Sequence, residues 1–273
     1  GATVISYVHD GRERFFTSTK SDISTSDPAA IRGGVPVCWP IFGPPNLDNP
    51  LHAQLKQHGF ARTSVWQLDT VDESEGQGVK AVFKLEPTPE IQAVWPQPFL
   101  LRYTVHLQAY SLSLSLAVTN PSSAIAPLHF QALLHAYFRL PEGTLPRDVR
   151  VTPLESLAFL DKVAGAKQKE TERRKVVDVD GPKGEVDRVY YRAPDRLELA
   201  FGGAQQGEVL KVHKTNLPDA VLWNPGPDKG KTIVDMEEGG ADRYVCLEPG
   251  LVEPFEALEP GKTWEGGFEM SFA

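Results

Sequence analysis

Strict alternation of serine with apolar residues over Ser111–Val118, "SLSLSLAV", is the pattern that most constrains the fold of this chain. A period of two places every second side chain on one face of a β-strand, whereas a helix would scatter these residues around its axis. Related patterns of five to eight residues recur at Val79–Glu86, Lys231–Met236 and Gly266–Phe272. We therefore predict that the chain folds mainly into short strands, each with one buried face.

Helical patterns are scarce in this chain, and turn-forming residues are frequent. The sequence holds 23 glycines and 23 prolines, while Pro89–Gln97 and Leu217–Asn224 offer at most one or two helical turns. Many short strands without intervening helices are typical of an antiparallel all-β sandwich or barrel. All-β sandwiches often reach 273 residues as one unit, so we expect a single domain over residues 1–273.

The net charge and the cysteine content limit the binding partners and the cellular compartment that we expect for this chain. A net charge of −8 argues against nucleic acid and anionic membranes, which require clustered positive charge. We find no apolar run of about 18 residues and no signal-peptide pattern, so we expect neither a membrane helix nor export. Cys38 and Cys246 lie far apart in apolar contexts. We expect two buried thiols in a reducing compartment, the cytoplasm.

Arginine stands at the head of an unusual segment, Ile31–Pro45, "IRGGVPVCWPIFGPP". Its prolines and glycines exclude regular helix, and its apolar residues argue against a solvated linker. Arg32 here and Arg62 in "QHGFARTSVW" carry planar donor groups suited to phosphate or carboxylate. Each alone is consistent with a structural ion pair. Together, in an acidic chain, they are candidates for binding an anion.

Three titratable residues enter apolar surroundings. His135 is flanked by leucine, alanine and aromatic residues, as expected of either a catalytic or a hydrogen-bonded core histidine. Glu248 in "RYVCLEPGLV" is expected where Pro-Gly ends a strand; burial there would raise its pKa toward that of a general base. The alternative is a glutamate that binds turn N–H groups. Asp187 follows the charged stretch that begins at Ala164, which we interpret as a solvated loop.

Familiar metal and nucleotide motifs are absent from the sequence. There is no H-E-x-x-H motif, no P-loop, no dinucleotide fingerprint and no G-x-S-x-G motif. His129 and His135 have a spacing that would place them on one face of a strand, but no third ligand accompanies them. We predict neither a metal nor another cofactor.

Six segments, taken in chain order, resemble the glucose-6-phosphate 1-epimerases, which are hexose-6-phosphate mutarotases of the aldose 1-epimerase superfamily. The segments are "IRGGVPVCWPIFGPP", "QHGFARTSVWQL", "LLHAYFRL", "EVDRVY", "VLWNP" and "CLEPG". The resemblance runs from Ile31 to the C-terminus. This chain departs from it chiefly in the charged stretch before Asp187, which bears on substrate preference.

The resemblance implies a large antiparallel β-sandwich of the galactose mutarotase type, with few short helices and a sugar site on the concave face of one sheet. It implies that His135 and Glu248 are the catalytic pair. It further implies substrate contacts by other residues, among which Arg32 and Arg62 would bind phosphate and Asp187 sugar hydroxyls; the others are Gln57, His58 and Trp223. The superfamily also favours a monomer.

The implied reaction interconverts the α and β anomers of a hexose 6-phosphate through ring opening. Glu248 would take the proton of the C1 hydroxyl while His135 protonates the ring oxygen. One alternative is a sugar-phosphate binding module without catalysis. Another is a glycoside hydrolase that uses Glu248 and Asp187 as its two carboxylates.

Overall fold

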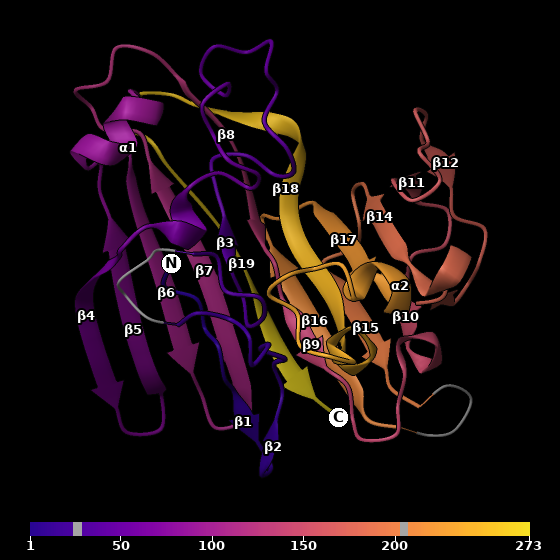
Figure 1. The fold of residues 1–273 in the computed structure, drawn as a ribbon. Coiled ribbons are helices and arrows are strands. Elements are labelled where there is room, and N and C mark those ends of the chain that lie inside the picture. The colour runs from indigo at the N-terminus through magenta and orange to yellow at the C-terminus, as the bar shows by residue number, and fades with distance from the viewer. Residues whose placement is uncertain (24–28, 203–206) are drawn as a thin grey trace.

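The computed structural model describes residues 1–23, 29–202 and 207–273, which form two antiparallel sheets packed face to face (Figure 1). In spatial order the first sheet contains β13 (Val177–Asp178), β10 (Arg150–Thr152), β15 (Arg196–Ala200), β16 (Val209–Thr215), β19 (Thr263–Phe272), β7 (Ser111–Thr119), β6 (Leu100–Leu107), β5 (Gly78–Leu85) and β4 (Gln67–Ser74). The predicted all-β sandwich is confirmed.

The second sheet carries the candidate site. In spatial order it contains β12 (Glu170–Thr171), β11 (Ala158–Asp161), β14 (Val186–Tyr190), β17 (Asp219–Asn224), β18 (Tyr244–Leu258), β8 (Leu128–Leu134) and β3 (Val37–Cys38), while β9 (Tyr137–Arg139) also pairs with β18. The remaining elements are short: the hairpin β1 (Val8–His9) and β2 (Arg12–Glu13), the helices α1 (Pro89–Val94) and α2 (Gly226–Gly230), and the 3₁₀ turns η1 (Ala61–Thr63), η2 (Pro146–Asp148), η3 (Pro182–Gly184) and η4 (Gly240–Arg243). No helix in the described parts of the chain has the length and apolar character needed to cross a membrane.

Strand β7 shows why the alternating pattern folds as it does. Leu112, Leu114, Leu116 and Val118 are each at most 2% exposed and point into the core between the sheets. The intervening serines face outward. Burial of each of these apolar side chains contributes about 1.5–3 kcal/mol. The strand prediction for Ser111–Val118 is therefore confirmed, because both faces have the environment that the pattern requires.

Central strands of the second sheet are buried on both faces. In β18, Val245 and Leu247 join the core shared with the first sheet. On the opposite face, Tyr244 and Cys246 pack with Phe16 in a separate apolar cluster. Segments outside the sandwich thus cover this outer face, so that it can hold a polar site shielded from bulk water.

Two local predictions are wrong. Leu217–Asn224 contributes the strand β17, not helical turns, because pairing with β14 and β18 on both sides overrides a weak local preference. Lys231–Met236 forms turns after α2, not a strand, since local N–H···O bonds such as Met236 to Ile233 replace a ladder. The helical turns predicted within Pro89–Gln97 do form, as α1. The Thr88 side chain caps this helix by accepting a hydrogen bond from the Ile91 N–H.

Strand β18 does not end at Glu248, contrary to prediction; it continues to Leu258. Pro249 is tolerated because pairing on the β8 side is interrupted between Cys246, opposite β9, and Gly250, opposite β8. His135 lies in this interruption, after the last residue of β8. His129 is exposed near the start of β8, so the predicted shared face of the two histidines is also wrong.

Asn224 joins the end of β17 to the segment that leads into β18. Its side-chain N–H groups donate to the carbonyls of Ala241 (2.9 Å) and Tyr244 (2.8 Å), and its oxygen accepts from the Gly226 N–H (2.8 Å). The side chain is 1% exposed. Water therefore cannot replace these bonds if the amide is removed.

We expect Asn224→Ala to lower the free energy of unfolding by about 2–4 kcal/mol, because it leaves buried backbone groups without partners. Urea denaturation followed by circular dichroism measures this change. The matched control, Asn46→Ala in an exposed loop, should cost under about 0.5 kcal/mol. Equal costs for the two variants would contradict the structural role of Asn224.

Candidate active site

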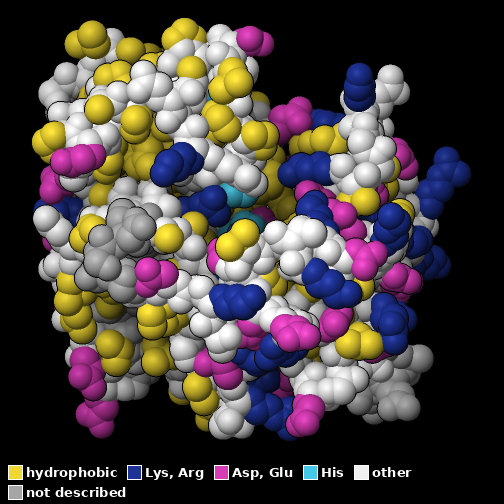
Figure 2. Space-filling model, in the orientation of Figure 1, with side chains coloured by type: hydrophobic (Ala, Val, Ile, Leu, Met, Phe, Trp, Pro, Cys, Tyr) yellow, Lys and Arg dark blue, Asp and Glu magenta, His cyan; other side chains and the backbone are white. Residues whose placement is uncertain are grey.

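A cavity of about 470 Å³ opens on the outer face of the second sheet. Figure 2 shows histidine side chains at the bottom of a hollow, with lysine and arginine side chains around it. The cavity is lined by Arg32, Phe42, Gly43, Pro44, Gln57, His58, Arg62, His135, Lys162, Asp187, Val221, Trp223, Lys229 and Glu248. All eight residues predicted for the site from the sequence are among them.

Strand register explains how distant segments meet in this cavity. Asp187 of β14 is paired with Trp223 of β17, and Glu248 of β18 with Val221 of β17. Paired residues of adjacent strands point to the same face, so these side chains project together from the sheet. His135 comes from the β8–β9 corner, where its N–H donates to the Pro36 carbonyl at 3.0 Å.

His135 and Glu248 form a close buried pair. The distance from His135 Nε2 to Glu248 Oε1 is 3.2 Å, and the side chains are 9% and 1% exposed. Tyr137 stacks on the imidazole with ring centroids 4.8 Å apart, and Trp223 meets it edge-on at 5.7 Å. The other polar atoms, His135 Nδ1 and Glu248 Oε2, have no partner among the described residues. Buried polar atoms of this kind are available to a ligand.

Burial pushes both members of the pair toward their neutral forms. It raises the pKa of Glu248 well above its usual value; the charge of Asp187 raises it further, while Lys162 and Arg62 oppose the rise. Burial likewise lowers the pKa of His135 well below its usual value, and His58 and the arginines add to this effect. Burial thus favours a His135–Glu248 pair that carries no net charge.

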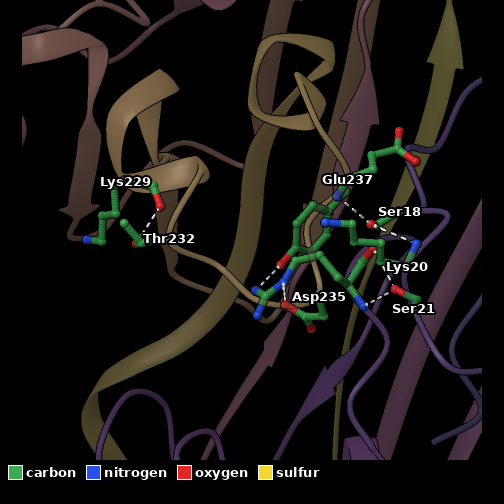
Figure 3. Close-up of polar contacts among 9 residues, drawn as sticks. Ser18, Lys20, Ser21, Lys229, Thr232, Asp235 and Glu237 are labelled. Atoms are coloured by element: carbon green, nitrogen blue, oxygen red, sulfur yellow. Dashed lines mark hydrogen bonds and ion pairs between the residues drawn. The ribbon is translucent and has the colours of Figure 1, made fainter.

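Arg32 is held in place through its side chain and its backbone. Its Nε donates to Asp235 Oδ1 at 3.1 Å, and its Nη1 donates to the Tyr137 hydroxyl at 3.2 Å. The Arg32 carbonyl accepts from Ser18 N–H, and the Ser18 hydroxyl accepts from Glu237 N–H at 3.0 Å (Figure 3). Burial would lower the pKa of Arg32, but Tyr137 and Asp235 outweigh it and raise the pKa. The guanidinium is thus a fixed positive charge at the cavity wall.

The turn before η1 supplies Gln57 and His58, and η1 itself supplies Arg62. His58 Nδ1 accepts from the Gly43 N–H at 3.1 Å; burial, followed by nearby cations, lowers the pKa of His58 to about 3. The ring is therefore neutral, and because Nδ1 accepts, its proton is on Nε2. Arg62 Nη2 donates to the Gln57 carbonyl at 2.8 Å, whereas its buried Nε has no partner among the described residues.

Sequence reasoning missed five side chains of the cavity: Phe42, Pro44, Lys162, Val221 and Lys229. Lys162 Nζ lies 3.6 Å from Asp187 Oδ1 and 4.4 Å from the centre of the Phe42 ring. Lys229 forms an ion pair with Glu185. Both lysines come from charged, loop-like sequence, where neighbours in space leave no periodic signal. The position of Lys162 directly after a strand, in "AFLDK", was the one available indication.

One group in the described parts of the chain has the geometry of metal ligands. Atoms of His135, Cys246 and Glu248 lie within 4.8 Å of one another. Metal binding would require the Cys246 thiolate, but burial raises the pKa of this thiol well above its usual value. The third residue beside His135 and Glu248 is therefore Cys246 and not His129. The absence of a bound metal stays a prediction.

Comparison with known proteins yields a consistent set of relatives. The aldose 1-epimerase family model matches residues 1–271. A relative from Cenchrus ciliaris, named "Putative glucose-6-phosphate 1-epimerase", is 33% identical over 277 residues, covering 99% of this chain and 79% of the relative. A relative of the same name from Escherichia coli is 30% identical over 251 residues, covering 91% and 76% of the two chains.

Solved structures agree in fold. A Salmonella typhimurium protein described as a "putative mutarotase" superposes with a TM-score of 0.86 at 26% identity, covering 100% of this chain and 84% of that one. A galactose mutarotase-like protein from Lactobacillus casei has a TM-score of 0.68 at 18% identity, with 97% and 90% coverage, a likeness of fold alone. The predicted galactose mutarotase type of sandwich is thereby confirmed. The chain belongs to the aldose 1-epimerase family and is an isomerase.

Proposed function

We propose that this chain interconverts the α and β anomers of hexose 6-phosphates, with glucose 6-phosphate as its principal substrate. The observation that carries this proposal is the combination of a buried pair in direct contact, His135 and Glu248, with four cationic side chains in one cavity. The protein as a whole carries a net charge of −8, so this local gathering of cations runs against its overall composition. The names of the relatives support the same substrate class.

Ring opening needs one proton removed and one delivered at neighbouring oxygens. Glu248 takes the proton of the C1 hydroxyl, His135 gives a proton to the ring oxygen O5, and the C1–O5 bond breaks to leave an open-chain aldehyde. Rotation about C1–C2 exposes the other face of the carbonyl, and closure reverses both proton transfers. The 3.2 Å between His135 Nε2 and Glu248 Oε1 suits the pair to two oxygens bonded to the same carbon.

Phosphate would also help to charge the catalytic acid. After burial and His58, the charges of Arg62 and Arg32 contribute to lowering the pKa of His135. A phosphate carries about −1.5 to −2 charges at neutral pH, so its binding beside these arginines offsets their effect. Imidazolium then becomes easier to form at the moment when the substrate is present. An unphosphorylated sugar brings no such charge.

Remaining side chains of the cavity fit contacts with the sugar. We assign Asp187 to sugar hydroxyls, because it is an acceptor on the cavity wall beside the pair. Gln57 and the neutral His58 offer further polar groups in the same cavity, and Trp223 supplies an apolar wall. Arg32 and Arg62 are assigned to the phosphate, since each presents fixed guanidinium donors.

Two alternative functions make different demands on the same residues. A binding module would take up hexose phosphate without accelerating anomer exchange. A glycoside hydrolase would release reducing sugar and would need Glu248 and Asp187 but not His135. Membership of the epimerase family and the direct contact of His135 with Glu248 both favour the isomerase.

We further propose that the chain acts as a single-domain monomer in the cytoplasm. One apolar cluster includes residues from Tyr7 to Met270, and both cysteines are buried and unpaired. We expect light scattering to give a mass near 30.1 kDa, with one cooperative unfolding transition in calorimetry. A dimer mass would contradict the first expectation, and two separated transitions the second.

We expect wild-type protein to accelerate anomer exchange of glucose 6-phosphate, measured by NMR saturation transfer. His135→Ala and Glu248→Gln should each lower kcat by about 10²–10⁴-fold, because each removes one of the two proton-transfer groups. Matched controls are His106→Ala and Glu265→Gln, on the first sheet away from the cavity. Wild-type protein that binds the sugar phosphate without accelerating exchange would refute the proposed function.

Arg32→Ala should raise KM for glucose 6-phosphate by about 10–100-fold, because it removes a charge-assisted contact with phosphate. Its use of plain glucose should change less than about 3-fold. Arg102→Ala is the matched control: its Nε also donates to an aspartate, Asp69 at 3.3 Å, but on the first sheet. An equal loss with glucose and glucose 6-phosphate would show that Arg32 is not the phosphate anchor.

A further inference from the structure

Lys162 is fixed beside Asp187 by the sheet itself. The antiparallel ladder pairs Asp161 of β11 with Arg188 of β14, so the next residues along it are Lys162 and Asp187. The Lys162 N–H donates to the Asp187 carbonyl at 2.9 Å, which extends the ladder by one bond. Residues opposite each other across strands share a face of the sheet. The lysine side chain therefore enters the cavity from the same side as Asp187.

The turn that follows holds the Lys162 backbone in this position. One oxygen of Asp161 accepts from the N–H groups of Val163 (3.0 Å) and Ala164 (3.1 Å), and the other accepts from Arg188 at 2.9 Å. The Lys162 side chain is 35% exposed and lies over the Phe42 ring, with its Nζ 3.6 Å from Asp187 Oδ1. It is an oriented charge at the mouth of the cavity.

The positive charge of Lys162 lies near two carboxylates of the proposed site, and burial makes both of them harder to ionise. Glu248 and Asp187 are two carboxylates that line one shielded cavity. Burial raises the pKa of each, and the charge of Asp187 raises the pKa of Glu248 further. For both groups, Lys162 is the leading counter-charge that lowers the pKa. Without such a cation, one of two neighbouring carboxylates tends to protonate.

We propose that Lys162 is a positioning residue that keeps the Asp187 and Glu248 carboxylates charged at the same time. The inference rests on the proposed function, in which Glu248 must accept a proton while Asp187 accepts hydrogen bonds from the sugar. Lys162 thereby sets the lower end of the pH range in which both carboxylates can work.

Other charged and titratable groups face Glu248 from several elements, and none of them replaces this lysine. Arg62 is the second counter-charge, but it is hydrogen-bonded to the Gln57 carbonyl and assigned to the phosphate. The remaining groups offer the carboxylate no fixed positive charge near neutral pH; they are His135, Cys38, Cys246, Tyr137 and Tyr244. Arg32 is hydrogen-bonded to Asp235 at the cavity wall. Lys229 also lowers the pKa of Asp187, but less than Lys162 does, and it is ion-paired with Glu185.

The test compares Lys162→Met with Lys162→Arg over a range of pH. Met keeps the stem over Phe42 but removes the charge, so the pKa of Glu248 rises and the limb in which kcat/KM increases with pH moves to higher pH. We expect a loss of about 3–10-fold at the acidic end and under about 2-fold on the alkaline plateau, a modest effect because the lysine is partly solvated. Lys162→Arg should retain most of the wild-type profile.

A second measurement does not depend on activity. The ¹³C shift of the Glu248 carboxyl, followed through a pH titration, should show a higher midpoint in Lys162→Met than in wild type. Lys167→Met, an exposed lysine in the same loop, is the control and should leave the midpoint unchanged.

Three outcomes are distinguishable. A higher Glu248 midpoint with a displaced acidic limb supports the inference. An unchanged Glu248 midpoint overturns it, as does a KM that rises equally at every pH, which would make Lys162 a direct phosphate contact. If wild-type protein does not accelerate exchange, the proposed function fails, while the Glu248 titration still decides the role of the lysine.

Discussion

Desolvation of the His135–Glu248 pair is the constraint on which the rest of this site depends. Moving a carboxylate and an imidazolium out of water is costly, and the cost falls when the pair is neutral overall or faces counter-charges. Both solutions are present here. The two groups are in direct contact, and Lys162 and Arg62 act on the glutamate from the cavity wall. A solvated pair would have ordinary pKa values and would exchange its proton with water rather than with a bound sugar.

The double burial of the second sheet makes this arrangement possible. Its inner face contributes to the core of the sandwich, which supplies most of the apolar burial and hence most of the stability. The outer face is then free to carry polar atoms that lack a partner in the described parts of the chain, such as His135 Nδ1 and Glu248 Oε2. The break between β8 and β9 serves both purposes, because it accommodates Pro249 in a central strand and places His135 opposite Glu248.

Sequence could predict what depends on local pattern and on motif order. Alternation identified β7, and six ordered segments identified the residues that meet in the cavity, because such segments carry contacts fixed by a shared fold. Prediction from sequence failed where pairing with a neighbouring strand determines the local structure. The pairing of β17 on both sides overrode a helical preference, and the interrupted ladder carried β18 past Pro249. Lys162 was missed because its place in the cavity depends on register with β14, and the local sequence indicates only that a strand ends before it.

Charge placement also bears on how a phosphorylated sugar is selected. With a net charge of −8, the protein repels an anion at distances where individual side chains are not resolved, so attraction must come from the mouth of the cavity. In the proposed reaction Arg32 and Arg62 supply this attraction, and they also lower the pKa of His135. Bound phosphate would offset that lowering and so make the imidazolium form of His135 easier to reach. In the proposed reaction, the interaction with phosphate therefore stabilises the ring-opening transition state more than the bound substrate. The phosphate group of the substrate thus contributes to catalysis as well as to binding.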